Sequence, residues 1–465
     1  MRVCEPFLFP GYFWPPGAES KKTSGNLRVT DGGAVEIELL GNFDGESFDP
    51  LSLHSDAPSR IFGLIEKHGV VTLENCSYRS KSTSLSGGLS KSTVTASHLV
   101  VGCHLDQAEP FSFNEFRFSV DGLEEWLSVG AIRVNYSDNG AGATINFGLP
   151  PKKVINGSFN GFSFSFDFGG SLPGFNPKQA QVTLKAFVRI RSETLQSFSD
   201  FVAIAYQTTQ FMRLILGEKL SICEAFLTRD DLKHDFSNGK RPNMHFPVFY
   251  QSLPFDRKIP EIKTYRALFL FPAAEHRFAP MLMNWLKMYE LFSPALGLYF
   301  SAFADQHSYL DQKFLSLAQA LETLHRRTTD RYRLSDAEYK ILRTKLVESC
   351  PEEHKDWLSQ RLHFANEIFL ADRLKELTLP FENLLGNPDS IEVMVKQIKN
   401  TRNYLTHFDP ELQKKAAKGR DLWLLCEKMQ ALFCLHLLQR IGLTQEELAT
   451  VARSENHVRD SLAAH

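Results

Sequence analysis

Three side chains that can act together on a phosphate lie close to one another near the end of the chain: Arg402, Asn403 and His407. The planar guanidinium of an arginine binds phosphate and stabilises the charge that develops during phosphoryl transfer. A histidine titrates near neutral pH and can pass protons as general acid or base. RNA carries its own nucleophile, because its 2′-hydroxyl can attack the neighbouring phosphate. The set therefore predicts RNA cleavage without a metal ion, leaving a 2′,3′-cyclic phosphate, with Asn403 orienting a phosphate oxygen.

The spacing alone is weak support for this chemistry. About one Arg-x4-His match is expected by chance in a chain of this composition, and a second match does occur at Arg229 and His234. That match lies outside the helical half of the chain, and we interpret it as coincidence. From periodicity alone, a capped helix end with a buried ion pair explains Arg402 and His407 equally well.

The residues before the motif predict one amphipathic helix. Asp389 or Ser390 is expected to cap it, directly after Pro388. One face at about 100° per residue is apolar and carries Ile391, Met394, Val395, Ile398 and Leu405. The other face is polar and carries Lys396, Asn400, Asn403 and His407.

Arg402 falls inside the apolar stripe of this helix. A guanidinium there is costly unless it is paired, and Glu322 is our candidate partner. Arg402 and His407 are about 140° apart around the helix. One chain is therefore expected to present half a site, which a second copy about a two-fold axis would complete.

Other helices follow the same periodicity after about residue 275. We predict one around Phe314 to Leu324, one from Trp357 through Leu377, and one around Leu422 to Leu437 that ends at Gly442. Thr444 and Glu447 form a capping box for a short last helix. Helices joined by short breaks indicate a bundle.

The first half of the chain shows period-two alternation instead, in residues 35–39, 162–168 and 182–188. Such alternation is typical of strands with one buried face, so hairpins in an antiparallel sheet or sandwich are expected. From residue 192 a helical period runs to Gly217. We therefore predict an α+β fold, with a β-rich domain (1–191), a mixed helical connecting region (192–274) and an all-α bundle (275–465).

Composition limits the partners and cofactors. The formal net charge is −2, so any contact with RNA must come from a local basic patch. Four lysines near the motif are candidates for it: Lys399, Lys414, Lys415 and Lys418. The solvated start of a helix explains the last three equally well.

No cofactor, no metal and no membrane span are expected. The seven cysteines are scattered, which is typical of free thiols in a reducing cytoplasm. Cys76, Cys103 and His104 could share a metal, but their spacing fits no standard ligand pattern, and buried small side chains explain the cysteines better.

The stretch 398–407, Ile-Lys-Asn-Thr-Arg-Asn-Tyr-Leu-Thr-His, resembles the signature of the HEPN superfamily, and its wording resembles the ApeA-like branch. Residues 314–326 and 360–362 are similar to the same branch. The N-terminal half, with Gly-Tyr-Phe-Trp-Pro at 11–15 and the runs 25–27 and 35–41, resembles the ApeA N-terminal domain. The likeness covers nearly the whole chain.

This resemblance implies a HEPN helical bundle that dimerises and acts as a metal-independent endoribonuclease in antiphage defence by abortive infection. Arg402 and His407 would be the catalytic pair and Asn403 the polar helper. Glu322 and Arg361 would support them. The implied partners are RNA, with tRNA among the candidates, a second copy of the chain and a phage-derived trigger. A non-catalytic HEPN dimerisation or RNA-binding module, joined to a ligand-sensing β-sandwich, is the alternative.

Overall fold

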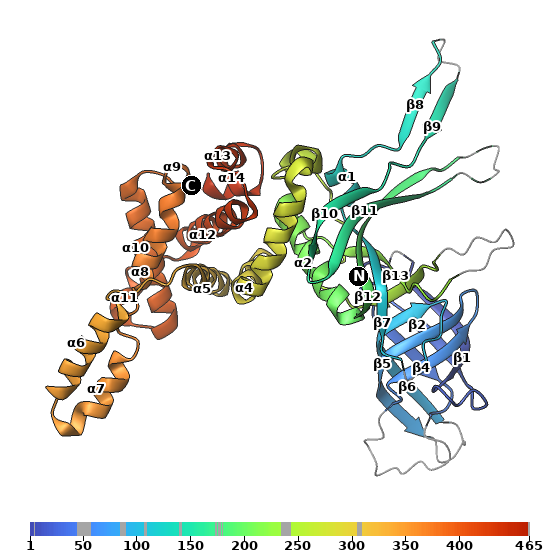
Figure 1. Ribbon diagram of the computed structural model, residues 1–465, viewed down its shortest axis with the longest axis horizontal. Helices are drawn as coiled ribbons and strands as arrows, with labels where there is room; N and C mark the ends of the chain where they lie inside the picture. Colours follow the sequence, from blue (N-terminus) through green and yellow to red (C-terminus); the bar gives the residue numbers. More distant parts are fainter. Residues whose placement is uncertain are drawn as a thin grey trace. The chain divides into compact units, whose positions relative to one another are not determined.

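The computed structural model describes the chain except for residues 4, 44–56, 84–89, 107–108, 139–141, 173, 175–177, 179, 234–242, 305–308 and 464–465. The chain divides into two compact units, Met1–Leu286 and Lys287–His465. The predicted order, a β-rich part followed by a helical part, is confirmed (Figure 1). The segment 192–274, which we expected to form a connecting region, lies inside the first unit.

Six strands at the start of the first unit close into an antiparallel barrel. They are β1 (Phe7–Trp14), β2 (Thr23–Val29), β3 (Val35–Leu39), β4 (Arg60–Ile65), β5 (Gly69–Thr83) and β6 (Ser90–Val101). The order β6-β3-β2-β1-β4-β5 returns to β6 because β5 pairs with both β4 and β6. Alternate residues point inward, so that Val35, Ile37 and Leu39 of β3 are all buried.

An open antiparallel sheet continues from the barrel. It contains β7 (Ser112–Val120), β10 (Lys153–Phe159), β11 (Phe162–Ser171), β12 (Thr183–Ser197), β13 (Ile222–Thr228) and β14 (Phe246–Tyr250). The order is β10-β11-β12-β7-β13-β14, and β14 pairs with β6 of the barrel. The predicted sheet is therefore confirmed, with a barrel joined to it in place of a sandwich.

One helix covers the apolar face of this open sheet. It is α2 (Phe198–Leu216), which begins where Ser197 accepts a hydrogen bond from the Asp200 amide and ends at Gly217 with a φ of 72°. The ring of Phe116 on β7 lies 5.6 Å from that of Phe198 and 6.2 Å from that of Phe201. The helical period predicted up to Gly217 is confirmed. The short α1 (Leu123–Leu127) and α3 (Phe271–Ala274) add Trp126 and Phe271 to this core.

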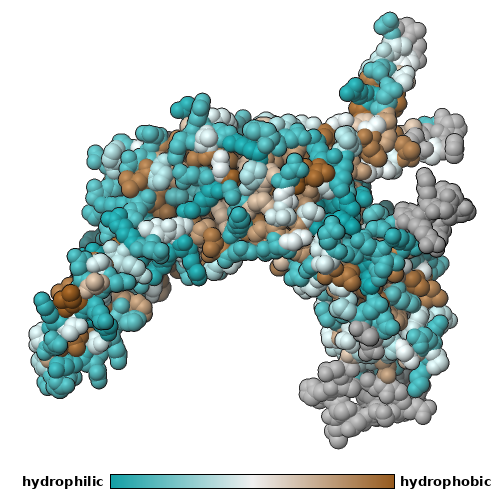
Figure 2. Space-filling view, in the orientation of Figure 1, coloured by the Kyte–Doolittle hydropathy of each residue, from teal (hydrophilic) through white to brown (hydrophobic). Residues whose placement is uncertain are grey.

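A separate two-stranded hairpin, β8 (Ile132–Tyr136) and β9 (Ala143–Phe147), stands apart from the large sheet. Val134 pairs with Ile145, and about half of each side chain is exposed. Figure 2 shows apolar surface on this hairpin.

The second unit is a helical bundle. α4 (Phe278–Ala304), kinked at Phe292, leads into it from the first unit. The helices that follow are α5 (Leu310–Thr328), α6 (Asp336–Glu348), α7 (Lys355–Leu362), α8 (Leu370–Thr378), α9 (Glu382–Leu385), α10 (Pro388–His407), α11 (Pro410–Gln413), α12 (Gly419–Ile441), α13 (Gln445–Arg453) and α14 (His457–Leu462). The Thr444–Glu447 capping box and the end of α12 at Gly442 are confirmed.

The single helix predicted from Trp357 through Leu377 is wrong. The chain instead forms α6 and α7 as a hairpin that packs on itself, and α8 begins only at Leu370. Asn366 explains the break, because its side chain accepts a hydrogen bond from the Leu334 amide and donates one to the Leu334 carbonyl, both at 2.9 Å. Ile341 and Trp357 stay exposed on this hairpin, where Figure 2 shows apolar surface.

None of the helices in the described ranges has the combination of length and apolar character needed to cross a membrane.

Candidate active site

The three motif residues lie in the last two turns of α10. Asn387 caps the helix by accepting a hydrogen bond from the Ser390 amide at 2.8 Å, with Pro388 in the first turn. The prediction of Asp389 or Ser390 as the cap is therefore wrong by two or three residues. The reason is that proline fits the first helical position, where its missing N–H is not needed.

The apolar stripe of α10 is buried only along the first part of the helix. Ile391, Met394, Val395 and Ile398 are at most 7 % exposed. Leu405 is half-buried, and 36 % of the Arg402 side chain is exposed. The expectation that Arg402 sits in the middle of a buried stripe is wrong, because the stripe leaves the core before it reaches the motif.

Arg402 makes two polar contacts. Its Nη1 donates to Oδ1 of Asn403 at 3.3 Å, and its Nη2 lies 3.8 Å from Oε2 of Glu322 on α5. The expected pairing with Glu322 is therefore present. A separation of 3.8 Å is a charge contact, too long for a hydrogen bond. Most N–H groups of this guanidinium are thus left for another acceptor.

His407 is the last residue of α10 and is exposed. Within the described part of the chain, its ring makes no hydrogen bond or ion pair. Five residues separate it from Arg402, which corresponds to about 7.5 Å along the helix and about 140° around it. Arg402, Asn403 and Glu322 are brought together, whereas the imidazole faces another side of the helix.

The lysines that follow the motif stay beside it. The buried Thr401 hydroxyl accepts a hydrogen bond from the Ala417 amide at 2.9 Å, which fixes this segment against α10. Lys414, Lys415 and Lys418 are exposed, and the Lys418 ammonium lies 5.9 Å from the centre of the Tyr404 ring. Lys399 is half-buried on α10.

Arg361 lies elsewhere. It is exposed on α7, in the hairpin that replaces the predicted long helix, and in the described part of the chain it makes no ion pair. The arginine that contacts Glu322 beside Arg402 is Arg326. Sequence reasoning missed this role, although the spacing of four between Glu322 and Arg326 on one helix is a usable signal.

A chain of alternating charges runs from this point into the bundle. The Arg326 guanidinium donates to Oε1 of Glu322 at 3.1 Å and lies 2.6 Å from Oε2 of Glu367. Glu367 is also 3.4 Å from Arg373, whose side chain is only 6 % exposed. Arg373 in turn donates to Nδ1 of the buried His325 at 3.3 Å.

The inner end of this chain is closed by Glu376. Since arginine can only donate, Nδ1 of His325 accepts from Arg373, and Nε2 therefore carries the proton that is donated to Glu376 at 2.9 Å. Arg331 forms an ion pair with the same carboxylate. His436 is a core residue whose Nε2 donates to the Leu377 carbonyl.

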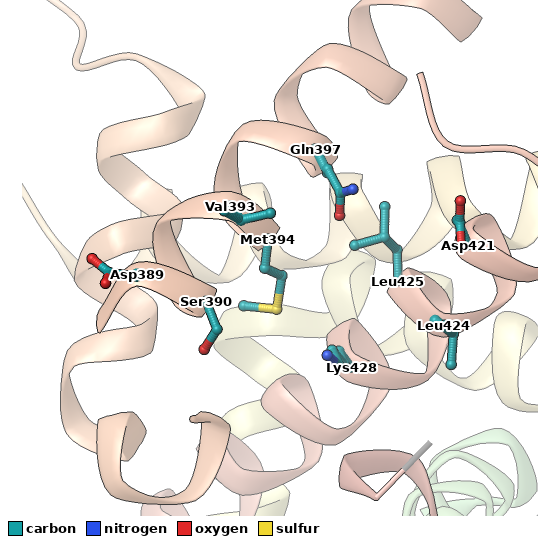
Figure 3. Close-up of a pocket in the computed structure, with 9 residues that line it drawn as sticks. All are labelled: Asp389, Ser390, Val393, Met394, Gln397, Asp421, Leu424, Leu425 and Lys428. Carbon is teal, nitrogen blue, oxygen red and sulfur yellow. The ribbon is translucent and has the colours of Figure 1, made fainter. Parts of the chain in front are cut away.

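A groove of about 410 Å³ lies between α10 and α12, and Figure 3 shows its lining. Val393 and Met394 from one helix face Leu424 and Leu425 from the other, with Asp389, Asp421 and Lys428 at the edges. None of the three motif residues lines it. The groove is therefore separate from the candidate active site.

The other sequence candidates have structural partners. The Arg229 side chain is 7 % exposed and forms ion pairs with Glu109 and Asp231, each at 2.6 Å. His234 lies outside the described residues. The described residues contain no group of three or more His, Cys, Asp or Glu side chains placed to hold a metal.

The residues considered for a metal are packed into the first unit. Burial raises the pKa of the Cys103 thiol to about 12 and also raises the pKa of Cys76. The His104 ring stacks on Phe62, with ring centres 4.4 Å apart.

The comparisons with known families agree with both units. Residues 315–447 match the family described as Apea-like HEPN, and residues 9–285 match ApeA N-terminal domain 1. The helical unit is thus a HEPN domain, a class whose members are generally ribonucleases. Because the N-terminal match alone spans more than half of the chain, the chain belongs to the ApeA family of antiphage defence nucleases. No curated protein and no solved structure matches it significantly.

Proposed function

We propose that this protein is a metal-independent endoribonuclease of antiphage defence, with its active site at the end of α10. The observation that carries the proposal is the loose placement of Arg402. Its guanidinium is partly exposed and lies 3.8 Å from Glu322, which is long for an ion pair. It can therefore bind a phosphate without first breaking a tight ion pair.

The reaction needs only groups that the RNA and this motif supply. The 2′-hydroxyl loses its proton as its oxygen forms a bond to phosphorus, and His407 passes protons in this reaction as general acid or base. The bond from phosphorus to the 5′-oxygen breaks, and that oxygen takes up a proton. Arg402 stabilises the extra negative charge on the phosphate, and Asn403, which accepts a hydrogen bond from Arg402, holds the guanidinium in place.

A two-fold dimer would complete the site. Since Arg402 and His407 face different sides of α10, one phosphate is better reached by Arg402 of one chain and His407 of another. The exposed Lys414, Lys415 and Lys418 would guide the RNA backbone. The barrel unit would sense a phage-derived trigger, and tRNA is a candidate substrate.

The first test uses the full chain with Arg402→Ala and His407→Ala, incubated with RNA in the presence and absence of a chelator. We expect each variant to lose at least about a thousandfold in cleavage rate. Products of the wild type should end in a 2′,3′-cyclic phosphate. If either folded variant cuts at the wild-type rate, the bundle is a non-catalytic dimerisation or RNA-binding module. If chelator abolishes cleavage, the metal-free mechanism is wrong.

The second test mixes the two inactive variants. In a mixed dimer, Arg402 of one chain and His407 of the other form one intact site. Since about half of the dimers are mixed and each has one of two sites, up to about a quarter of wild-type activity should return. No return of activity after subunit exchange would contradict the shared site.

A further inference from the structure

Two arginines of the bundle share one carboxylate. Oε1 of Glu322 accepts from both Nε and Nη2 of Arg326, at 3.3 and 3.1 Å, whereas Oε2 faces Arg402 at 3.8 Å. Arg326 lies on α5 and Arg402 on α10, so the two guanidinium groups approach from different helices. Glu322 therefore holds them side by side.

Both guanidinium groups keep N–H groups for a further acceptor. Arg326 uses Nε and Nη2, and within the described part of the chain its Nη1 has no partner. Its side chain is 46 % exposed and that of Arg402 is 36 % exposed. Each group thus has an accessible edge that can donate to an anion.

The row of ion pairs that runs from Arg402 to Glu376 carries a net positive charge. Four arginines (Arg326, Arg331, Arg373 and Arg402) meet three glutamates (Glu322, Glu367 and Glu376). The longest of these ion-pair contacts is the one between Glu322 and Arg402, at the exposed end of the row. One positive charge is therefore uncompensated where the two arginines meet solvent.

We propose that Arg326 forms a second phosphate subsite, which binds the RNA phosphate next to the one held by Arg402. This subsite rests on the proposed function, because it assigns Arg402 to the phosphate that is cut. Glu322 is the spacer that sets the two guanidinium groups at neighbouring backbone positions. The subsite selects substrates with at least two consecutive phosphodiesters and reads no base.

The alternative is that Arg326 only stabilises the bundle through Glu322 and Glu367. The two roles differ in how substrate length matters. A structural arginine affects every substrate equally, whereas a second phosphate ligand affects only RNA that has a second phosphate.

The test compares a dinucleoside monophosphate with a longer oligoribonucleotide that contains the same cleavable step. With Arg326→Ala, kcat/KM on the oligonucleotide should fall about 10- to 100-fold, as for the loss of charge-assisted hydrogen bonds. The dinucleotide should change by less than about twofold. Arg326→Lys, which keeps the charge, should recover part of the loss. Equal losses on both substrates would overturn the subsite.

Arg327→Ala is the matched control. Arg327 is the exposed neighbour of Arg326 and makes no ion pair in the described part of the chain, so its substitution removes the same charge without removing an ion pair. It should leave the ratio of the two kcat/KM values unchanged. A drop as large as that of Arg326→Ala would mean a general charge effect and would also overturn the subsite. Melting temperatures of both variants check that the bundle stays folded.

Binding tests the subsite without cleavage. In a His407→Ala background, the affinity for the oligoribonucleotide is measured against salt concentration. Arg326→Ala should lower the slope of log K against log salt by about 0.7, the contribution of one phosphate on a single strand. An unchanged slope contradicts the subsite. If the wild-type protein cuts no RNA but Arg326→Ala still lowers the slope, the phosphate subsite is supported and the proposed nuclease function is rejected.

Discussion

Two arginine–carboxylate pairs, one in each unit of this protein, differ in how fully the protein satisfies the guanidinium. In the first unit, Arg2 donates to both carboxylate oxygens of Asp121, at 3.2 and 2.8 Å, and both side chains are at most 7 % exposed. In the second unit, Arg402 meets Glu322 at 3.8 Å, and both side chains are partly exposed. The tight pair organises the fold, whereas the loose pair leaves a cation ready for a ligand.

Neighbouring contacts extend this contrast. Two further N–H groups of Arg2 donate to the carbonyls of Arg257 and Lys258, and Asp121 also accepts from the Ser221 amide. Arg402 donates to no backbone carbonyl in the described residues, and its one hydrogen-bond acceptor there is the side-chain oxygen of Asn403. A guanidinium that the protein satisfies is structural, and one that the protein leaves open is available for chemistry.

The largest expected effect is the difference in how much the Arg2–Asp121 pair and the Arg402–Glu322 pair contribute to the free energy of unfolding. Asp121→Ala leaves Arg2 buried without its partner and should lower the free energy of unfolding of the first unit by about 3 to 5 kcal/mol. Arg402→Ala should change that of the second unit by less than about 0.5 kcal/mol. Denaturant unfolding followed by fluorescence measures both, in variants that keep only Trp126 in the first unit or only Trp423 in the second and have the other tryptophans replaced by phenylalanine. Equal losses would remove the distinction between the pairs.

Acid should weaken both units through one histidine in each, the half-buried His98 in the first and the buried His436 in the second. Burial lowers the pKa of His98 and of His436 to about 4, compared with 6.5 when unfolded. Between these values the unfolded chain binds more protons than the folded chain. The contribution of each histidine to the free energy of unfolding is therefore fully present above about pH 6.5. It falls as the pH decreases towards 4, by up to about 3 kcal/mol per histidine.

His436→Gln tests this pH dependence, because glutamine can still donate to the Leu377 carbonyl but does not titrate. The variant should show a flatter loss of stability in the second unit between pH 6.5 and 4, with the first unit unchanged. An unchanged slope in the second unit would mean that other groups cause its acid sensitivity.

A smaller effect concerns the contact that holds the basic segment beside the motif. Thr401→Val removes the acceptor for the Ala417 amide and should cost about 1 kcal/mol. Hydrogen exchange at the Ala417 amide should become faster. Thr406→Val is the control, because the Thr406 hydroxyl bonds only to the Arg402 carbonyl within α10. Faster exchange at Ala417 in both variants would show that fraying of α10, and not the lost acceptor, is responsible.

The smallest effect concerns how the helices of the two units end. The residue that follows α2 is Gly217, with a φ of 72°, whereas the residue that follows α10 is Phe408, with a φ of 52°. A phenylalanine is strained in this left-handed region, and its side chain is 70 % exposed. Phe408→Gly should therefore raise the free energy of unfolding of the second unit by about 0.5 to 1 kcal/mol. A decrease would show that the contact of Phe408 with Tyr404 outweighs the strain.

The parts of the fold that local patterns control could be predicted from the sequence. Alternation over residues 35–39 gave β3, and the helical period before Gly217 gave α2. Closure of the barrel could not be predicted, because it depends on pairing between β5 and β4 and between β5 and β6, which no local pattern encodes. The break before α8 was missed because it depends on Asn366 bonding to Leu334, 32 residues earlier.

The candidate site was predictable only in part. Glu322 was found as the neighbour of Arg402 because a charge inside an apolar stripe demands a partner. The exposure of Arg402 was not foreseen, since helical periodicity does not reveal where a stripe leaves the core. The contact of Arg326 with Glu367 was not foreseen, because Glu367 lies in the segment that we expected to be helical.

The pairing of β6 affects how the protein is made. β6 contacts β3, β5 and β14, so the barrel and the open sheet depend on one shared strand. Its last partner, β14, ends at Tyr250, well before Arg402 and His407 in the chain. During synthesis the first unit can therefore finish folding on the ribosome before the motif is translated. The unit proposed to sense a trigger would therefore be folded before the proposed nuclease site exists.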